Sequence, residues 1–408
     1  MNNVEVIVIG DELLLGQVTD TNSGEIARRL GPSGLTVSRV TTVGDNGADI
    51  RCAIESALAS ADIVITTGGL GPTKDDITKS VMMDIFGGEL RLDEATLANV
   101  RDVVARRSIT LNALTESQAM VPTSCEVIQN RVGTAPIMWF ERDGKVLVAM
   151  PGVPFETREM LAREVAPRLV RRFVGGEVAA HKTVITHGII ESALAELLAP
   201  WEERLPAGYH LAYLPRPGLV RLRIDGPAGE TLDDLHRDLT ERLGAYVLAD
   251  DDLTPPEILL NELRARSLTL ATAESCTGGN IAHELTLVAG SSDVFAGGVV
   301  SYSNDVKMRL LGVSADTLAA RGAVSEEVVA EMVRGARKAT GADVAIATSG
   351  IAGPSGAVPG KPVGTVCMGV ATPRGVVTVT GHFPGNRARV IDRATMEAII
   401  MAIKEVRR

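Results

Sequence analysis

Three short apolar segments in the first part of the chain each end at glycine or proline, and they constrain the fold more than any other feature. The segments are residues 4–9, 62–67 and 146–150. Continuous runs of this kind are typical of strands buried on both faces of a parallel sheet. A helix is predicted at residues 23–30, with Asn22 and Glu25 spaced like a capping box. Alternating strands and helices predict an α/β domain with a mostly parallel sheet over residues 1–172.

The remaining chain divides into two further blocks. Residues 175–250 alternate strand and helix signals around a Pro-Arg-Pro-Gly turn at 215–218, which predicts a small α+β domain. Three aspartates at 250–252 and the pair Pro255-Pro256 indicate a linker. Residues 257–408 again read as α/β, and a helix from about residue 387 to residue 406 closes the chain. The strands expected in this last block are residues 268–271, 298–301, 344–348, 363–371 and 376–380.

Charge and composition exclude several classes of protein. A formal net charge of −10 without a basic run argues against direct nucleic-acid binding, which depends on Lys and Arg at phosphates. The four cysteines form no Cys-x-x-Cys pair and the six histidines no zinc-binding pair, so neither a zinc site nor a disulfide scaffold is indicated. No apolar stretch approaches the roughly 18–20 residues of a membrane span. We therefore expect a cytoplasmic protein.

The sharpest chemical signal is the segment Ala-Glu-Ser-Cys-Thr-Gly-Gly at residues 273–279, which follows a strand and opens a helix. Ser275 would lie near the positive end of that helix, beside backbone N–H groups able to bind an anion. The donors expected there are those of Thr277, Gly278 and Gly279. They would form an oxyanion hole beside a serine nucleophile. On spacing alone, a simple helix cap by Ser275 or Thr277 is an equal alternative.

A serine nucleophile needs a base, and Lys307 follows the next predicted strand. Burial lowers the pKa of a lysine, which leaves a neutral amine able to accept the serine proton, and Tyr302 could relay or orient that proton. The alternative reading makes Lys307 a solvated helix residue and Tyr302 a core aromatic residue.

Two further segments of the last block suit an anion. The loop at residues 348–354 combines small residues with backbone donors, and Arg387 stands at a helix start, where a guanidinium suits a phosphate. The loop candidates are Thr348, Ser349 and Gly353. A plain loop and a surface charge remain the alternatives.

In the first block, carboxylates and glycines follow successive strands, where α/β folds bind ligands. The candidates for a nucleotide site are Asp11, Glu12, Asn22, Gly68, Gly69, Gly71 and Thr78. Asp45, Asp75 and Asp76 add carboxylates that could hold a divalent metal ion. Solvated surface carboxylates are the alternative.

Several motifs together resemble the competence/damage-inducible CinA proteins, over essentially the whole chain. They are Gly-Asp-Glu-Leu-Leu at 10–14, Thr-Asn at 21–22, the Gly-rich segment at 68–78, Met-Pro-Gly-Val-Pro at 150–154, and the two segments at 273–279 and 349–354. The resemblance implies a domain similar to the molybdopterin-binding MoaB/MogA type at 1–172, a KH-like domain at 175–250 and an amidohydrolase domain of the PncC type at 257–408.

The resemblance also implies activities. For the last domain it implies the hydrolysis of nicotinamide mononucleotide to nicotinic acid mononucleotide and ammonia. The implied roles are nucleophile for Ser275, general base for Lys307, companion of the base for Tyr302 and contact with the substrate phosphate for Arg387. It gives the first domain metal-dependent hydrolysis of ADP-ribose, with Asp45 and Asp76 holding Mg²⁺, Mn²⁺ or Co²⁺. The amidase needs no cofactor.

The expected partners are therefore small-molecule nucleotides and a second copy of the chain, without membrane or nucleic acid. The KH-like block lacks a Gly-x-x-Gly loop between basic residues, so the resemblance does not imply RNA binding. Two other functions stay open at this point. The first domain could bind a nucleotide or pterin without turnover, or the protein could act as an interaction factor in competence or DNA repair.

Overall fold

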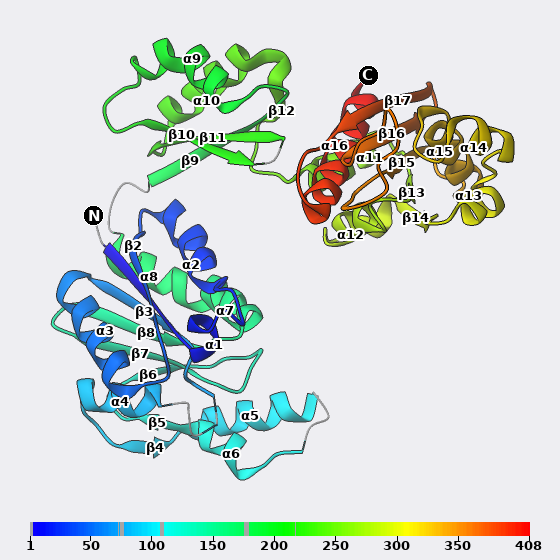
Figure 1. Cartoon of the computed structure of the whole chain (residues 1–408). Coiled ribbons are helices and arrows are strands. Elements are labelled where there is room, and N and C mark those ends of the chain that lie inside the picture. Colours follow the sequence, from blue (N-terminus) through cyan, green and yellow to red (C-terminus); the bar gives the residue numbers. More distant parts are fainter. Residues whose placement is uncertain (1–2, 72, 74–76, 107–109, 175–178, 217) are drawn as a thin grey trace. The chain divides into compact units, whose positions relative to one another are not determined.

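A computed structural model of the chain describes residues 3–71, 73, 77–106, 110–174, 179–216 and 218–408 (Figure 1). The chain separates into two compact units, Met1–His181 with Asp225–Leu232 and Lys182–Ile224 with Asp233–Arg408. Within the described ranges, no helix is both long enough and apolar enough to cross a membrane.

The first unit is built on a six-stranded sheet with the order β2-β1-β3-β8-β7-β6. Strands β2, β1, β3 and β8 are parallel, whereas β7 and β6 are antiparallel additions at one side. The strands are β1 (Asn3–Ile9), β2 (Thr36–Val43), β3 (Ile63–Thr67), β6 (Glu126–Ile128), β7 (Ile137–Arg142) and β8 (Lys145–Met150). The expected mostly parallel sheet is confirmed.

Helices cover both faces of this sheet, which explains why its central strands are apolar throughout. One buried cluster joins β1 and β3 to α2, α7 and α8, and a second joins the opposite face to α3 and α4 (Figure 1). The helices and remaining strands are α1 (Asp11–Leu14), α2 (Asn22–Leu30), α3 (Gly47–Ser60), α4 (Thr78–Phe86), β4 (Leu90–Leu92), α5 (Glu94–Arg106), α6 (Ala113–Glu116), β5 (Met120–Pro122), α7 (Pro154–Met160) and α8 (Ala166–Phe173).

The expected capping box of α2 is wrong. The N-cap residue is Thr21, and the preceding Asp20 satisfies the helix start, because its Oδ1 atom accepts hydrogen bonds from the backbone N–H groups of Asn22 and Ser23. The Asn22 amide is buried and is used elsewhere, as a clamp described below. Glu25 forms ion pairs with Arg28 and Arg158 rather than turning back on the helix start.

The block at 175–250 forms a four-stranded sheet with the order β10-β11-β9-β12, accompanied by two helices (Figure 1). Its elements are β9 (Ala179–His187), α9 (Glu191–Glu202), β10 (His210–Arg216), β11 (Leu219–Pro227), α10 (Glu230–Leu243) and β12 (Val247–Ala249). Strands and helices are both present, as the sequence signals of this block predict.

The last block contains a five-stranded sheet with the order β14-β13-β15-β16-β17. Strands β14, β13 and β15 are parallel, and β16 and β17 continue the sheet antiparallel. The strands are β13 (Leu270–Glu274), β14 (Phe295–Val300), β15 (Val344–Gly350), β16 (Thr365–Thr372) and β17 (Gly375–His382).

Helices lie on both faces of this sheet as well. Buried residues of α11, α12 and α16 pack on one face, and those of α13 and α15 pack on the other. The helices are α11 (Pro255–Ala265), α12 (Asn280–Thr286), α13 (Asn304–Leu311), α14 (Ala315–Arg321), α15 (Glu326–Thr340) and α16 (Arg387–Arg407). The carboxyl ends of β13 and β14 and the turn into α12 therefore meet at one edge.

The predicted linker at Pro255-Pro256 is wrong. Both prolines are buried and form the first turn of α11, where a missing N–H costs nothing because that position has no intrahelical acceptor. Thr254 precedes them as the cap, and Glu257 accepts hydrogen bonds from its backbone N–H at 2.6 Å and from its hydroxyl at 2.7 Å. The last block therefore begins structurally at Thr254.

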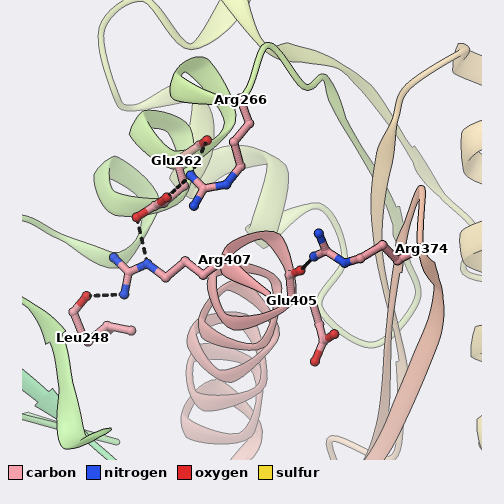
Figure 2. A network of polar contacts seen from close by, with 6 residues as sticks. All are labelled: Leu248, Glu262, Arg266, Arg374, Glu405 and Arg407. Carbon is pink, nitrogen blue, oxygen red and sulfur yellow. Dashed lines mark hydrogen bonds and ion pairs between the residues drawn. The ribbon is translucent and has the colours of Figure 1, made fainter. Parts of the chain in front are cut away.

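Arginines fasten the last turn of α16 to three other elements (Figure 2). Arg407 donates to Glu262 of α11 at 2.7 Å and to the backbone carbonyl of Leu248 in β12 at 2.8 Å. Arg266 also donates to Glu262, and Arg374 of the β16–β17 turn donates to the carbonyl of Glu405. The terminal helix is thus held at both the five-stranded and the four-stranded sheet.

Candidate functional site

Ser275 and Lys307 lie together at the carboxyl edge of the five-stranded sheet. The Nζ atom of Lys307 is 3.0 Å from the Oγ atom of Ser275, although 32 residues separate them in sequence. Ser275 directly follows β13, and its backbone N–H donates to the carbonyl of Thr348 in β15 at 2.9 Å. The serine is 9% exposed. A nucleophilic hydroxyl and an amine within hydrogen-bond reach are the geometry that proton abstraction requires.

Lys307 is buried, so the alternative prediction of a solvated helix residue is wrong. It lies on α13, whose first turn is capped by the Ser303 side chain, and its side chain is 1% exposed. Burial lowers the pKa of Lys307 below its ordinary value of 10.5, because a charged ammonium loses its water. Nζ also donates to the backbone carbonyl of Ser301 at 2.7 Å, which fixes the amine beside the serine.

The turn after Ser275 offers fewer anion donors than the sequence predicts. The N–H of Gly278 donates to the carbonyl of Ser275 at 3.1 Å, and that of Gly279 donates to the Glu274 carboxylate at 3.0 Å. Of the three expected donors, only Thr277 keeps a backbone N–H without a partner among the described residues. Neither Ser275 nor Thr277 caps α12, because the helix follows Gly279, which has no side chain.

Glycine is required in this turn for conformational reasons. Gly278 and Gly279 have φ values of 64° and 101°, a region that L side chains avoid. The two successive left-handed residues reverse the chain between β13 and α12. The side chain of Glu274 can therefore reach the N–H groups at the start of the helix, where its Oε1 atom accepts from Ala282 at 2.9 Å.

Tyr302 and Arg387 pair with each other across the site. One guanidinium nitrogen of Arg387 donates to the Tyr302 hydroxyl at 2.8 Å, and another donates to the carbonyl of Gly353 at 2.8 Å. Tyr302 is 61% exposed, so it is no core aromatic residue. Within the described part of the chain, no hydrogen bond joins its hydroxyl to Ser275 or Lys307. Arg387 thus links the loop after β14 to the loop after β15 through hydrogen bonds.

The two hydroxyl residues at the end of β15 have separate contacts. The Oγ1 atom of Thr348 is 2.7 Å from that of Thr277, which places it beside the turn that carries Ser275. The Ser349 hydroxyl donates to the carbonyl of Ala323 at 2.7 Å. The structure therefore brings Thr348 to the serine and binds the Ser349 side chain to the loop before α15.

The first unit has its own cavity, of about 680 Å³, at the carboxyl ends of β1, β3 and β8. Gly68 and Gly69 form part of the wall, with φ values of 108° and 64°. A Cβ atom on Gly68 would stand 2.1 Å from the carbonyl oxygen of Ile9, so glycine is required for the close approach of the two loops. The sequence prediction of a site at these strand ends thus coincides with the cavity.

Asn22 and Thr78 stand at the cavity with different surroundings. Asn22 lines it, and its amide nitrogen donates to the hydroxyl of Thr67 and to the carbonyl of Gly152, both at 2.8 Å. It therefore clamps the ends of β3 and β8 together. Thr78 is buried at the start of α4 near Gly69, and its hydroxyl has no hydrogen-bond partner among the described residues. Gly71 also lines the cavity.

The carboxylates after β1 and β2 approach one another. The backbone N–H of Asp11 donates to Asp45 at 3.0 Å, and that of Asp45 donates to Asp11 at 3.1 Å. Glu12 and Asp45 both line the cavity. Asp75 and Asp76 lie outside the described residues, so the expected pair of metal ligands is represented here by Asp45. Among the described residues, no group of three or more His, Cys, Asp or Glu side chains is arranged to hold a metal ion.

Two groups at the serine site were not singled out from the sequence. The carbonyl of Ser301 could not be found there, because backbone acceptors leave no residue signature. Glu274 has a recognisable signal, namely a carboxylate immediately before a strand-to-helix turn whose glycine cap has no side chain. Its contacts are developed below.

Two family models match separate parts of the chain. Residues 5–171 match the family model described as "Probable molybdopterin binding domain", and residues 254–406 match the model of the CinA C-terminal domain. The second match starts at the cap of α11 and contains Ser275, Lys307 and Arg387.

Full-length relatives are similar over almost the whole chain. A CinA-like protein of Cytophaga hutchinsonii is 40% identical, with 99% of this chain and 98% of the relative covered. A CinA-like protein of Chlorobaculum tepidum is 41% identical over 98% of this chain and 99% of the relative. A crystal structure of a competence-damaged protein (CinA) superfamily protein from Klebsiella pneumoniae is 38% identical over 38% of this chain and 96% of that chain, with a TM-score of 0.37.

Proposed function

This chain belongs to the family of CinA-like proteins, and on that premise we propose that it is a bifunctional enzyme of pyridine-nucleotide salvage. Its C-terminal domain hydrolyses nicotinamide mononucleotide to nicotinic acid mononucleotide and ammonia. The observation that carries this proposal is the buried Lys307 amine 3.0 Å from the Ser275 hydroxyl.

In the first half of the reaction, Ser275 Oγ attacks the carboxamide carbon while neutral Lys307 takes the hydroxyl proton. A neutral amine keeps two N–H bonds and one lone pair. With one N–H donated to the Ser301 carbonyl, the lone pair can face Ser275. The N–H of Thr277 stabilises the developing oxyanion. The C–N bond then breaks, Lys307 returns its proton to the leaving nitrogen, and ammonia departs from an acyl-enzyme.

In the second half, Lys307 takes a proton from a water molecule, which attacks the ester carbon. The Ser275 oxygen leaves and regains a proton from Lys307, and the product acid is released. Arg387 binds the substrate phosphate in this proposal, since a guanidinium suits a phosphate and this one stands at the start of α16, in contact with Tyr302 and the loop after β15. Tyr302 orients Arg387 through the contact between their side chains.

The test of this function is ammonia release from nicotinamide mononucleotide by the purified chain. We expect activity in the wild type and loss of it in a folded Ser275→Ala variant, with an acyl-enzyme on Ser275 detected by mass spectrometry after a rapid acid quench. Wild-type protein that releases no ammonia would refute the proposal.

For the N-terminal domain, we propose hydrolysis of ADP-ribose to AMP and ribose 5-phosphate. The observation that favours it is the nucleotide-sized cavity at the strand ends of the first unit. Among its described lining residues, four are carboxylates and none is Lys or Arg. A pyrophosphate would be repelled there unless a cation accompanies it.

The residues of this cavity fit a divalent cation in kind, because carboxylate oxygens are the ligands that Mg²⁺ and Mn²⁺ prefer. Asp45 would be one ligand, and Glu12 lines the same cavity. When bound, the metal ion would offset charge at the phosphates of the substrate. The chain's own contribution is the close approach of backbone at Gly68 and Gly69 and the clamp that Asn22 makes across the wall.

A different class of function remains the alternative for this domain, namely binding of a nucleotide or pterin without turnover, with the protein acting as an interaction factor in competence or DNA repair. Calorimetry with ADP-ribose and Mg²⁺, followed by chromatography of the mixture, separates the two. Binding with the ligand recovered intact would favour the alternative.

A further inference from the structure

Glu274 is a buried carboxylate directly beside the candidate nucleophile. It is 1% exposed, and charged side chains are rarely buried unless their hydrogen-bonding capacity is satisfied. Its Oε2 atom accepts from the Thr277 hydroxyl at 2.7 Å and from the N–H groups of Gly279 and Ile281 at 3.0 Å each. Its Oε1 atom accepts from the N–H of Ala282 at 2.9 Å. Four donors from the turn and the first turn of α12 thus converge on one side chain.

These contacts replace the missing cap of α12. The helix follows Gly279, which offers no side-chain acceptor, so its first N–H groups would otherwise be unsatisfied in a buried setting. Because Glu274 takes up the N–H groups of Gly279, Ile281 and Ala282, the start of α12 is closed to other anions. The carboxylate therefore ties the turn at residues 275–279 to the start of α12.

The carboxylate also sets the direction of a hydrogen-bond chain. A carboxylate only accepts, so the single hydroxyl proton of Thr277 goes to Glu274. In the 2.7 Å contact between Thr277 and Thr348, Thr348 must then be the donor. The backbone carbonyl of Thr348 in turn accepts from the N–H of Ser275 at 2.9 Å. Glu274, Thr277 and Thr348 thus form one series of hydrogen bonds that ends at the backbone N–H of Ser275.

We propose that Glu274 is a positioning residue for the hydrolysis at Ser275. It does not touch the substrate. It fixes the turn so that Ser275 Oγ stays within reach of Lys307 Nζ and the N–H of Thr277 stays beside the attacked carbonyl. The inference rests on the proposed deamidase activity, and a displacement of about 1 Å in such a turn costs about 10²-fold in rate.

The test compares Glu274→Gln, Glu274→Asp and a matched control in the full-length chain. The control is Glu284→Gln, at a half-buried position later in the same helix. An amide at 274 keeps the size of the side chain, but its NH₂ group confronts other donors. We expect kcat for nicotinamide mononucleotide to fall about 10²-fold in Glu274→Gln with KM changed less than threefold. Glu274→Asp should recover part of the loss, and Glu284→Gln should match the wild type.

A second readout separates this inference from the proposed function. Phenylmethylsulfonyl fluoride sulfonylates an activated serine irrespective of the natural substrate, and mass spectrometry gives the rate at Ser275. We expect this rate to fall in Glu274→Gln in parallel with kcat. If the wild type is sulfonylated in a Glu274-dependent way but releases no ammonia, the proposed function is wrong and the positioning role stands.

The role of Glu274 is overturned if folded Glu274→Gln keeps both rates within threefold of the wild type. Should that variant fail to fold, Thr277→Val removes only the hydroxyl link, with Thr286→Val on the same helix as its control. We expect Thr277→Val to lose about tenfold in both rates. Wild-type rates in Thr277→Val would equally overturn the proposal.

Discussion

The guanidinium of Arg387 donates a 2.8 Å hydrogen bond to the hydroxyl of Tyr302, and this contact links the start of α16 to the loop after β14. The same guanidinium holds the carbonyl of Gly353. Three loops of the candidate amidase site are therefore connected through one side chain. This gives Tyr302 a task that differs from relaying a proton between Ser275 and Lys307.

Tyr302→Phe should raise KM for nicotinamide mononucleotide by about three- to tenfold while kcat stays within threefold. Removing the hydroxyl deletes one hydrogen bond of a net worth of about 1 kcal/mol, which is roughly a fivefold effect. Steady-state kinetics measure both constants, with Tyr246→Phe in the other part of the same unit as control. A fall in kcat as large as that of Ser275→Ala would show that Tyr302 takes part in the proton transfer.

Lys307→Arg should lower kcat by about 10³-fold, because a guanidinium stays protonated near neutrality and cannot accept the serine proton. The double variant with Ser275→Ala should be little worse than either single variant, since the two side chains act as a unit. Lys338→Arg on the exposed side of α15 is the matched control. A folded Lys307→Arg enzyme with most of its rate would remove this lysine from the mechanism.

The rate of deamidation should rise with pH along a limb that lies below 10.5, the ordinary pKa of a lysine. Burial lowers the pKa of Lys307, and only the neutral amine is a base, so activity increases as pH rises through the lowered pKa. A profile of kcat/KM against pH locates the limb. A limb at or above 10.5 would contradict the assignment.

The same shift affects stability, with a sign that can be checked. Between the lowered pKa of Lys307 and 10.5, the unfolded chain binds a proton that the folded chain does not, so the free energy of unfolding increases with pH in that window. Urea denaturation of wild type and Lys307→Met at several pH values measures this contribution. We expect the slope against pH to be smaller in Lys307→Met, and equal slopes would be the contrary result.

Chelation of divalent cations should abolish ADP-ribose hydrolysis and leave deamidation unchanged, because the Ser275 and Lys307 chemistry uses no metal ion. Asp45→Asn should lower ADP-ribose hydrolysis by at least tenfold, since it removes one charge from the cavity wall. Asp143→Asn, in an exposed turn of the same unit, is the control. Chromatography of the nucleotides measures the first activity and ammonia release the second. Equal loss of both activities on chelation would disprove two independent sites.

A fragment that begins before Thr254 should be more stable than one that begins at Glu257. The shorter fragment lacks the Thr254 cap and the two buried prolines that open α11. Loss of the cap alone costs about 1 kcal/mol. Thermal unfolding of fragments 253–408 and 257–408 measures the difference, and equal midpoints would show that the first turn of α11 contributes nothing.

The sequence by itself determined the layered α/β character of both large blocks. Buried strands such as β1 and β3 are recognisable as continuous β-branched runs, because this pattern depends only on neighbouring residues. The same holds for the strand-to-helix turn at Ser275, where two glycines mark the reversal. The family resemblance rests on short contiguous motifs of this kind, and the comparisons bear it out.

Only the tertiary structure decided which side chains meet and which donors remain available. Nothing in the neighbouring sequence marks Lys307 as buried. Its amine is buried beside Ser275 because α13 packs against α15 and the five-stranded sheet. The sequence predicts that the N–H of Gly279 is available to an anion, but in the structure this N–H donates to Glu274. The composition around Pro255 predicts a linker, whereas in the structure this residue is buried in the first turn of α11. Which donor pairs with which acceptor, and which surface is buried, depends on contacts between segments that are distant in sequence. Local periodicity therefore cannot predict these pairings.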